Sequence, residues 1–532
     1  MPEWGDLQVD QLRFMAGRHR DEVAYRDLGA GSALTFGQWE EESNRLARGL
    51  VARGVAAGDR ASIYLPAEEV LRWIVAYAAV HKAGAVAVPT NTRLSPRELA
   101  VILGHCEAVA MVTCRELLPT ALEVRREVPT LQLVVSAGGS GNDIVAYDDA
   151  LDADGSAFQV PVGIDDLADV MYTSGTTGLP KGVAVRHKNV AMIPNNEPVW
   201  SATGWLHGAP MFTFAGIAFI YNPMKMGMAG FYLPKFDAGR WLELVERERP
   251  MMTMLVPAMA ELLVAHPDFE KRDLSSLVAV SIGSAPLAPQ TLLAMQERLP
   301  DASVSNSYGM TEAGPAYIVM PQEEVTKRIG SVGKPIPPME IKIVDDTDAE
   351  CPAGEVGELL TRMPGVQREY YRDPEATAQT WTPDGWLRSG DLGYADDDGF
   401  LYLVGRKKDL IIRGGHNVYP TDIEAVIHEH PAVQEAAVVG VPHAVLGEDV
   451  AAFVATKPGV ALDADDLQSF CAERLADYKR PRQVSFLAEL PRNATGKVVR
   501  AVLRDRARRD HPVPSAPSTT TETTTPTTTE AP

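Results

Sequence analysis

The sequence predicts a mixed α/β fold, with a large N-terminal part followed by a smaller α+β part. The chain has 532 residues, more than one hydrophobic core usually organises, so at least two domains are expected. Helix-like and strand-like segments alternate through much of the N-terminal part, and short strands broken by Gly and Pro follow over residues 330–405. We therefore expect two α/β sheet subdomains, a small β-rich subdomain and a small C-terminal domain.

The alternation is clearest near the N-terminus. Residues 36–54 (FGQWEEESNRLARGLVARG) have the spacing of a long amphipathic helix that ends at Gly54, and residues 60–66 (RASIYLP) predict a short buried strand. A second helix closed by glycine is expected over residues 70–84, and a second strand over residues 85–91. Strands that alternate with helices of this length predict a parallel or mixed sheet.

The pattern changes twice further along the chain. The segments GSVGKPIPPMEIKIVDD, GEVGELLTR and GFLYLVGR predict the β-rich subdomain. From Lys408 onward, residues 422–442 predict a helix and then a strand, and residues 463–476 predict a helix with an acidic first turn. We therefore place an N-terminal domain at 1–407, a C-terminal α+β domain at 408–510, and a Thr/Pro-rich segment at 511–532 that is a disordered tail or an appendage.

The composition excludes some classes of partner. A net charge of −21 argues against nucleic acid or an anionic membrane as the main partner, because both require basic patches. The four cysteines have no metal-ligand spacing, which favours a reduced, intracellular protein. Neither a signal peptide nor a membrane-spanning apolar run is found in the sequence. We expect a cytoplasmic monomer or homodimer that acts on small molecules.

A loop suited to phosphate occurs at residues 172–185 (YTSGTTGLPKGVAV). Glycines allow close backbone approach, hydroxyl groups donate hydrogen bonds, and Lys181 supplies a positive charge. The segment is not a Walker loop, because Lys181 is followed by Gly182 and by a Val-Ala-Val alternation typical of a strand. An ordinary kinase or motor ATPase is therefore excluded.

Four further segments follow this loop along the chain: NSYGMTE (306–312), GWLRSGDLG (385–393), GRKKDLIIRGGHNVYP (405–420) and LPRNATGKVVR (490–500). With these five motifs in order, the sequence resembles the adenylate-forming superfamily of acyl-CoA synthetases, stand-alone adenylating enzymes and firefly-type luciferases. Its last part is most similar to the acyl-CoA synthetase branch. The resemblance implies that the C-terminal domain is mobile and that a carboxylic acid is activated with ATP and Mg²⁺.

The chemistry explains the motifs. A carboxylate must displace pyrophosphate from ATP, an attack of an anion on a polyanion, so catalysis requires positioning together with cations and donors. The resemblance assigns Lys181 as counter-ion of the β- and γ-phosphates. It assigns the cradle around them to Thr173, Ser174, Gly175, Thr176, Thr177 and Gly178.

In NSYGMTE, the resemblance assigns Tyr308 to stacking on adenine and Asn306 to its exocyclic amine. Thr311 would bond the α-phosphate and Glu312 would hold Mg²⁺, a cation that prefers carboxylate and phosphate oxygens. The remaining nucleotide-lining residues implied by the resemblance are Ser284, Ala285, Ser307, Gly309 and Met310.

Three charged residues complete the implied nucleotide site. Asp391 would accept from the ribose hydroxyls, and Arg406 would steady the ribose and phosphate from the far side. The resemblance brings Lys497, in an otherwise ordinary polar turn, to bridge the incoming carboxylate and the α-phosphate.

The second half-reaction needs a thiol, for which the resemblance implies coenzyme A. Lys408 would be the hinge on which the C-terminal domain swings, and Gly414 and Gly415 would lie against the pantetheine arm. The basic segment YKRPR (478–482) would meet CoA phosphates or be a solvated face; the sequence leaves both open.

The acyl pocket departs from the family pattern. Residues 209–216 read APMFTFAG, so Thr213 stands where histidine is common, and gating would fall to Phe212 or Phe214. Gly216 and Gly283 are the remaining residues assigned to this pocket, and Ala215, Gly216 and Ala285 are expected to leave room for a large acid. No aspartate lies between residues 205 and 218, which disfavours α-amino acids because a buried ammonium needs a partner. Methionines clustered at residues 192–259 suit an apolar acid or ordinary core packing.

The leading hypothesis is a Mg-ATP-dependent carboxylate–CoA ligase. The alternative is a stand-alone adenylating enzyme that loads an acyl group onto a separate carrier protein. A non-catalytic nucleotide sensor is disfavoured because Lys181, Glu312, Asp391 and Lys497 are all present. A monooxygenase of the luciferase kind shares the motifs and stays open.

Overall fold

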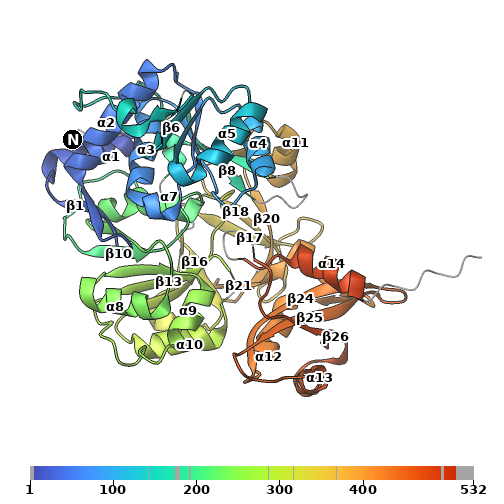
Figure 1. Ribbon diagram of the computed structural model, residues 1–532. Coiled ribbons are helices and arrows are strands. Elements are labelled where there is room, and N and C mark those ends of the chain that lie inside the picture. Colours follow the sequence, from blue (N-terminus) through green and yellow to red (C-terminus); the bar gives the residue numbers. More distant parts are fainter. Residues whose placement is uncertain are drawn as a thin grey trace, which may run out of the picture. The chain divides into compact units, whose positions relative to one another are not determined.

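A computed structural model describes residues 5–139, 141, 143–173, 180–190, 193–285, 287–314, 317–366, 368–492 and 497–510. The chain forms two compact units that divide between Lys407 and Lys408, and each is described here by itself. Within the described residues, the larger unit holds three sheets and the smaller unit holds one (Figure 1). The predicted mixed α/β class is confirmed. The predicted tail at 511–532 lies outside the described residues.

The first sheet of the larger unit has the strand order β19-β9-β8-β4-β3-β5-β6-β7. Its central strands are parallel, whereas β9 and β19 add antiparallel strands at one edge. The predicted strands after residues 60 and 85 lie in this sheet, and the Val-Ala-Val alternation after Lys181 is strand β9. The strands are β3 (Arg60–Ile63), β4 (Val86–Pro89), β5 (Ala110–Cys114), β6 (Leu133–Ala137), β7 (Val145–Ala146), β8 (Leu167–Thr173), β9 (Lys181–Arg186) and β19 (Glu369–Tyr370).

Local sequence signals explain where the helices beside this sheet begin and end. Helix α2 (Phe36–Ala52) begins at a capping box in which the Thr35 hydroxyl accepts from the Gln38 amide and the Gln38 side chain accepts from the Thr35 amide. Helix α3 (Val70–Lys82) ends before Gly84, whose φ of 72° suits glycine. Both glycine-closed helices were predicted. The other helices are α1 (Gln8–Arg18), α4 (Pro96–His105), α5 (Leu118–Glu127), α6 (Tyr147–Ala150) and α11 (Pro374–Thr380).

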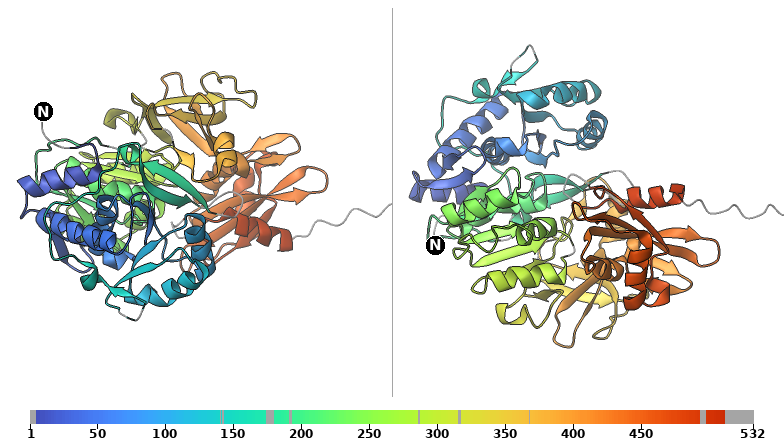
Figure 2. Two further views of the ribbon diagram at one scale, coloured as in Figure 1. Left: turned by 90° about the horizontal axis from the view of Figure 1, so that it is seen from above. Right: turned by 60° about the horizontal axis from the view of Figure 1, so that its bottom comes forward.

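The second sheet has the order β14-β13-β12-β10-β11-β1-β2 and is parallel except for β2. Helices α8 (Ala238–Glu248), α9 (Pro257–Val264) and α10 (Pro289–Arg298) cover one face, where they share a buried apolar cluster with the strands (Figures 1 and 2). Helix α7 (Phe214–Lys225) contacts β10 and β11 of this sheet and shares a buried apolar cluster with residues of both sheets. The strands are β1 (Val23–Asp27), β2 (Ser32–Thr35), β10 (Gly204–His207), β11 (Ala229–Tyr232), β12 (Met252–Leu255), β13 (Ala279–Gly283) and β14 (Ser303–Ser307).

The third sheet is antiparallel throughout, with the order β15-β16-β21-β20-β18-β17. It is the β-rich subdomain that the Gly- and Pro-punctuated segments predict, and it places Asp391 and Arg406 on neighbouring strands. Its strands are β15 (Ile318–Val319), β16 (Ser331–Pro335), β17 (Glu340–Val344), β18 (Gly357–Arg362), β20 (Leu387–Ala395) and β21 (Leu401–Arg406).

The smaller unit has a sheet covered on both faces. Alternate residues of β24 and β25 point to opposite sides: Val438 and Val450 pack with helix α12, whereas Val439 and Phe453 pack with Leu503 of the last helix. The predicted helix–strand pair and the helix with an acidic first turn are both present. The elements are β22 (Ile411–Arg413), β23 (His416–Val418), α12 (Pro420–His428), β24 (Val433–His443), β25 (Gly447–Thr456), α13 (Ala464–Arg474), β26 (Gln483–Phe486) and α14 (Arg500–Asp510).

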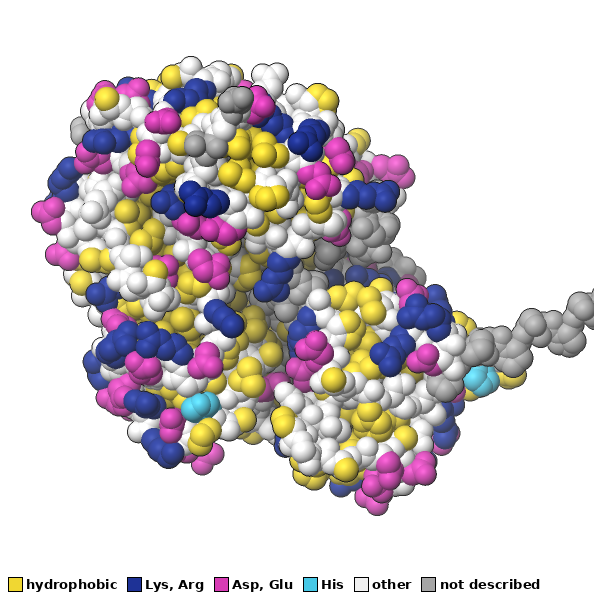
Figure 3. Space-filling view, in the orientation of Figure 1, with side chains coloured by type: hydrophobic (Ala, Val, Ile, Leu, Met, Phe, Trp, Pro, Cys, Tyr) yellow, Lys and Arg dark blue, Asp and Glu magenta, His cyan; other side chains and the backbone are white. Residues whose placement is uncertain are grey.

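Basic and acidic side chains are interspersed over the face of the molecule seen in Figure 3. Many of them form exposed ion pairs within one unit, such as Arg249 with Asp273 and Arg482 with Asp477. Pairs of this kind contribute little to stability. Among the described residues, no helix is both long and apolar enough to cross a bilayer.

Candidate active site

The carboxyl edge of the second sheet brings two predicted segments together. Strands β13 and β14 are parallel neighbours, and their last residues, Gly283 and Ser307, are register partners. A Cβ on Gly283 would lie 2.6 Å from the carbonyl oxygen of Ser307, so a side chain at this position would collide with the neighbouring backbone. Ser284 then turns with φ of 73°. As a result, residues 283–285 and 306–312 leave the same edge, where ligands of open α/β sheets bind.

A second group of predicted residues meets at Glu312. The Thr173 hydroxyl, at the end of β8, donates to Oε1 of Glu312 at 3.2 Å. Lys181 begins β9 and is the register partner of Thr173. The structure therefore places the lysine of the phosphate loop beside the acidic residue of a motif about 130 positions away in the sequence. Ser174, Gly175, Thr176, Thr177 and Gly178 lie outside the described residues.

Tyr370 joins this group, although the sequence motifs did not indicate it. Its hydroxyl donates to Oε1 of Glu312 at 3.4 Å, and its ring centroid lies 4.8 Å from the Lys181 ammonium. Tyr370 reaches this place because strand β19 pairs with β9, a contact between residues far apart in sequence. Burial, followed by the charge of Glu312, raises the pKa of Tyr370, so its hydroxyl stays protonated and able to donate.

A third group forms on the β-rich sheet. Asp391 on β20 faces Arg406 on β21, with Arg406 Nε 2.9 Å from Oδ1 of Asp391. The Tyr308 hydroxyl donates to Oδ2 of the same carboxylate at 2.6 Å. Arg406 thus lies directly against Asp391, and its predicted contact with the ribose and phosphate stays a prediction. Burial and the charge of Asp391 raise the pKa of Tyr308 well above its usual value, which keeps the donor protonated.

The segment assigned to the acyl pocket differs from expectation in one respect. Thr213 caps helix α7: its hydroxyl accepts from the Gly216 amide at 3.1 Å and donates to the Pro210 carbonyl at 2.7 Å. The Cβ position of Gly216 lies 2.2 Å from that same carbonyl oxygen. Gly216 therefore lets the chain approach the helix closely and does not leave the room for an acid that we expected of it. Phe212 and Phe214 flank the cap and are half-buried.

The clustered methionines divide between core and surface. Met211 and Met224 are buried in the apolar cluster that helix α7 shares with both sheets, whereas Met226 is 45% exposed. Core packing accounts for the buried members, and Met192 lies outside the described residues.

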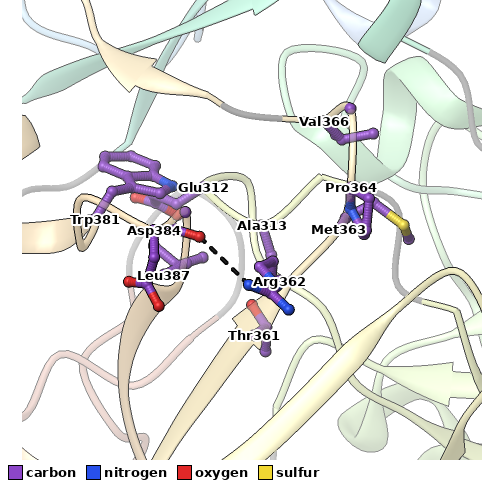
Figure 4. Close-up of a pocket in the computed structure, with 12 residues that line it drawn as sticks. Glu312, Ala313, Thr361, Arg362, Met363, Pro364, Val366, Trp381, Asp384 and Leu387 are labelled. Atoms are coloured by element: carbon purple, nitrogen blue, oxygen red, sulfur yellow. Dashed lines mark hydrogen bonds between the residues drawn. The ribbon is translucent and has the colours of Figure 1, made fainter.

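A pocket of about 210 Å³ opens beside Glu312 (Figure 4). Arg362, at the end of β18, donates to the Asp384 carbonyl across this pocket at 3.5 Å. Of the predicted site residues, Glu312 lies in its wall. The pocket is lined by Glu312, Ala313, Thr361, Arg362, Met363, Pro364, Gly365, Val366, Trp381, Asp384, Gly385 and Leu387.

The smaller unit carries the remaining predicted residues. Gly414 and Gly415 form the turn between β22 and β23 with φ of 56° and 83°, a turn for which glycine is suited. The Gly414 amide donates to the Leu446 carbonyl at 2.8 Å. Lys497 is exposed and precedes helix α14. The roles of Lys408, Gly414, Gly415 and Lys497 stay predictions.

The residues present fit a magnesium ion bound together with phosphates. Within the described part of the chain, no three His, Cys, Asp or Glu side chains gather as a metal cage. Glu312 instead offers one carboxylate with the hydroxyls of Thr173 and Tyr370 beside it. Mg²⁺ is commonly held by one or two carboxylates plus substrate phosphates, so this donor set suits it.

Comparison with known proteins agrees with this arrangement. Residues 12–371 match the AMP-binding enzyme family, and residues 422–497 match the AMP-binding enzyme C-terminal domain. A feruloyl-CoA synthase of Amycolatopsis is 34% identical over 482 residues, covering 90% of this chain and 94% of the relative.

Two solved structures are similar along nearly the whole chain. The anthranilate CoA ligase AuaEII in complex with anthranoyl-AMP has a TM-score of 0.86 and 29% identity, covering 96% of this chain and 98% of its own. ATP-bound MatB from Rhodopseudomonas palustris has a TM-score of 0.83 and 30% identity, and the match covers 94% of this chain and 99% of the MatB chain. The chain thus belongs to the AMP-binding enzyme family and is an AMP-forming acyl- or aryl-CoA ligase.

Proposed function

We propose that this enzyme joins a bulky, apolar carboxylic acid, other than an α-amino acid, to coenzyme A at the expense of Mg-ATP. In the first step, a carboxylate oxygen of the acid attacks the α-phosphorus, and the bond from phosphorus to the pyrophosphate oxygen breaks. In the second step, the thiol sulfur attacks the acyl carbon, the bond to the AMP oxygen breaks, and the thiol proton passes to solvent. The products are pyrophosphate, AMP and the acyl-CoA thioester.

The observation that carries this proposal is the meeting of Thr173, Lys181 and Glu312. Lys181 and the Thr173 hydroxyl supply a positive charge and a donor for the β- and γ-phosphates. Glu312 supplies the carboxylate for Mg²⁺, which when bound neutralises charge on the phosphate oxygens. Thr311, next to Glu312 in the same loop, supplies a hydroxyl for the α-phosphate.

Asp391 suits the ribose because its carboxylate oxygens can accept further hydrogen bonds. An ionised carboxylate offers about four acceptor positions, and Tyr308 and Arg406 take two of them. The same bond from Tyr308 fixes its ring, which supplies a flat face for adenine. The residues that would line the base and the α-phosphate are Ser284, Ala285, Asn306, Ser307, Gly309 and Met310.

The smaller unit would contribute different residues to the two steps. Lys497 would bridge the carboxylate and the α-phosphate while the adenylate forms. A rotation at Lys408 would then present the turn at Gly414 and Gly415 to the pantetheine arm, since glycine permits close backbone approach.

The segment around helix α7 supports the proposed class of acid. Residues 205–218 contain no Asp or Glu, so this segment offers no carboxylate to pair with a substrate ammonium group. The relatives named for feruloyl-CoA and anthranilate support an aromatic or similarly bulky acid.

Pyrophosphate exchange across a panel of acids tests the proposal. Aliphatic, aromatic or polycyclic acids should support exchange better than any standard amino acid. Mass detection of the product should then find the thioester with coenzyme A in preference to a pantetheinylated carrier protein. Strong exchange with one amino acid and none with apolar acids would overturn the acid class, and product on the carrier alone would overturn the acceptor.

A further inference from the structure

A buried arginine lies behind the Thr311–Glu312 loop. Arg368 is 1% exposed and comes just before strand β19. One Nη donates to the Thr311 carbonyl, and the other donates to the Asn189 carbonyl at 2.7 Å. Its guanidinium carbon lies 4.5 Å from the ring centroid of Phe214, the first residue of helix α7. One side chain therefore contacts the Thr311 loop, the turn after β9 and the start of α7.

The Thr311 loop closes around this guanidinium. Gly314 has φ of 78°, and a Cβ there would lie 3.1 Å from Val366 and 3.2 Å from the Arg368 guanidinium carbon. A larger side chain at Gly314 would push against Arg368. The loop is thus held at Thr311 by a hydrogen bond and at Gly314 by close packing.

The charges of two carboxylates, Asp169 and Glu312, act on this cation. Asp169 is fully buried in β8, where it accepts from the Tyr77 hydroxyl at 2.9 Å and lies 3.1 Å from His81 Nε2. Burial lowers the pKa of Arg368 to about 10, and the charges of Asp169 and Glu312 oppose that fall. Arg368 is therefore still charged at neutral pH.

Packing alone does not explain an arginine here. Burying a guanidinium carries a desolvation penalty that an apolar side chain of similar size would not incur. What an apolar residue cannot supply is a rigid fork of donors that reaches two carbonyls at once. The position of the Thr311 carbonyl is thus the property that this arginine fixes.

We infer that Arg368 is a positioning residue for adenylate formation, which holds the Thr311–Glu312 loop in place and couples it to Phe214 at the start of helix α7. The inference rests on the proposed roles of Thr311 and Glu312 in the first step. It does not require Arg368 to touch any substrate.

Two variants of differing chemistry test this inference. Arg368→Met removes both the charge and the donors, whereas Arg368→Lys keeps the charge and loses the fork. Arg368→Met should lower the kcat of pyrophosphate exchange by about tenfold to a hundredfold and raise the half-saturating Mg²⁺ concentration, because a small misplacement of catalytic groups has effects of this size. Arg368→Lys should fall between Arg368→Met and the wild type. Both variants should convert pre-made acyl-adenylate to thioester within about twofold of the wild-type rate, because the loop is not needed for thiol attack.

Arg186→Gln is the matched control, since Arg186 lies on the neighbouring strand β9 and pairs with Glu369 at the surface. It should leave all these constants unchanged. Exchange kinetics and Mg²⁺ dependence equal to wild type in folded Arg368→Lys would overturn the inference. Equal losses in exchange and in thiol transfer would overturn it as well, because they would show a general structural defect.

Mg-ATP binding, measured by calorimetry without acid, separates this inference from the proposed function. If no acid supports exchange even in the wild type, the proposed function fails. The inference about Arg368 is then still decided by Mg-ATP binding: weaker binding by Arg368→Lys than by the wild type supports it, and unchanged binding refutes it. The coupling to α7 is tested by Phe214→Leu, whose effect on Mg-ATP binding should disappear in the Arg368→Met background. Additive effects of the two changes would refute that coupling.

Discussion

The carboxylate of Asp391 has partners on both oxygens, since Arg406 contacts Oδ1 and the Tyr308 hydroxyl donates to Oδ2. Two residues that the sequence assigns to separate parts of the nucleotide are thus bonded to each other. The orientation of the Tyr308 ring and that of the carboxylate depend on one hydrogen bond, so a change at either residue will affect both.

Tyr308→Phe keeps the ring and removes this bond. Because one hydrogen bond contributes about 1 kcal/mol, the KM for ATP in pyrophosphate exchange should rise about fivefold. Asp391→Asn should raise it further, because the amide loses the charge that faces Arg406. The double variant should cost less than the two single effects added together. Strict additivity would contradict the shared role.

Lys497 and Lys181 should differ in which step they affect. Losing one preorganised electrostatic contact costs roughly 2.7–4 kcal/mol, about a hundredfold to a thousandfold in rate. Lys497→Ala should lower the rate of adenylate formation by that factor. The same variant should still transfer the acyl group from pre-made adenylate at near the wild-type rate. Lys181→Ala should weaken the use of ATP. Unchanged pyrophosphate exchange in Lys497→Ala would refute its assigned role.

At the scale of elements, helix α7 begins at a cap formed by the Thr213 hydroxyl. Thr213→Ala leaves the Gly216 amide without its acceptor and should lower the free energy of unfolding by about 1 kcal/mol. Thr213→Ser retains the cap and should lie close to wild type. Urea denaturation monitored by tryptophan fluorescence measures both, and an unchanged Thr213→Ala would show that the cap is dispensable.

The sequence predicted helices and strands correctly where neighbouring residues determine them. The helix that ends before Gly54, the helix that ends before Gly84 and strand β9 all follow from side-chain periodicity and glycine. The resemblance, and not any local pattern, assigned Thr173, Lys181 and Glu312 to one nucleotide site. The structure places Thr173 in contact with Glu312 and in register with Lys181, and the roles of the three residues stay predictions.

Contacts between distant strands could not be predicted in this way. Tyr370 reaches Glu312 because β19 pairs with β9, and the buried position of Arg368 depends on three segments folding around it. The crowding at Gly216 depends on the path of the Pro210 carbonyl, which the sequence does not indicate. Periodicity describes which face of an element is apolar, and it carries no information about the partner of that face.

At the scale of the whole molecule, the core of the larger unit contains two neutral histidines. Burial lowers the pKa of both His187 and His207 to about 3, with a further contribution from His81 at His187. His207 Nε2 lies 2.6 Å from the Tyr25 hydroxyl, so the ring is held in place by a hydrogen bond within the core. Protonation of either ring would bury a charge.

These two histidines predict acid sensitivity. Each has a folded-state pKa below its unfolded value near 6.5, so their contribution to stability is fully present above pH 6.5 and is lost as the pH falls toward 3. Each should add about 1.4 kcal/mol per pH unit to the slope of unfolding free energy below pH 6.5. Melting temperatures between pH 7.5 and 5 should fall accordingly. His207→Phe should lower stability overall but flatten this slope, and an unaltered slope would argue against the assignment.

The boundary between the units has a consequence for how such enzymes diversify. Lys407 is tied back to the larger unit, with its ammonium 3.0 Å from Asp346 and 3.3 Å from Glu358, and the smaller unit has an apolar core of its own. A recombination point after Lys407 leaves these ion pairs and that core whole. The residues assigned to acid choice stay on one side of the junction, and those assigned to the thiol acceptor stay on the other. We therefore expect that exchanging the smaller unit at this junction would change the preference for an acceptor and leave the preference for an acid in place.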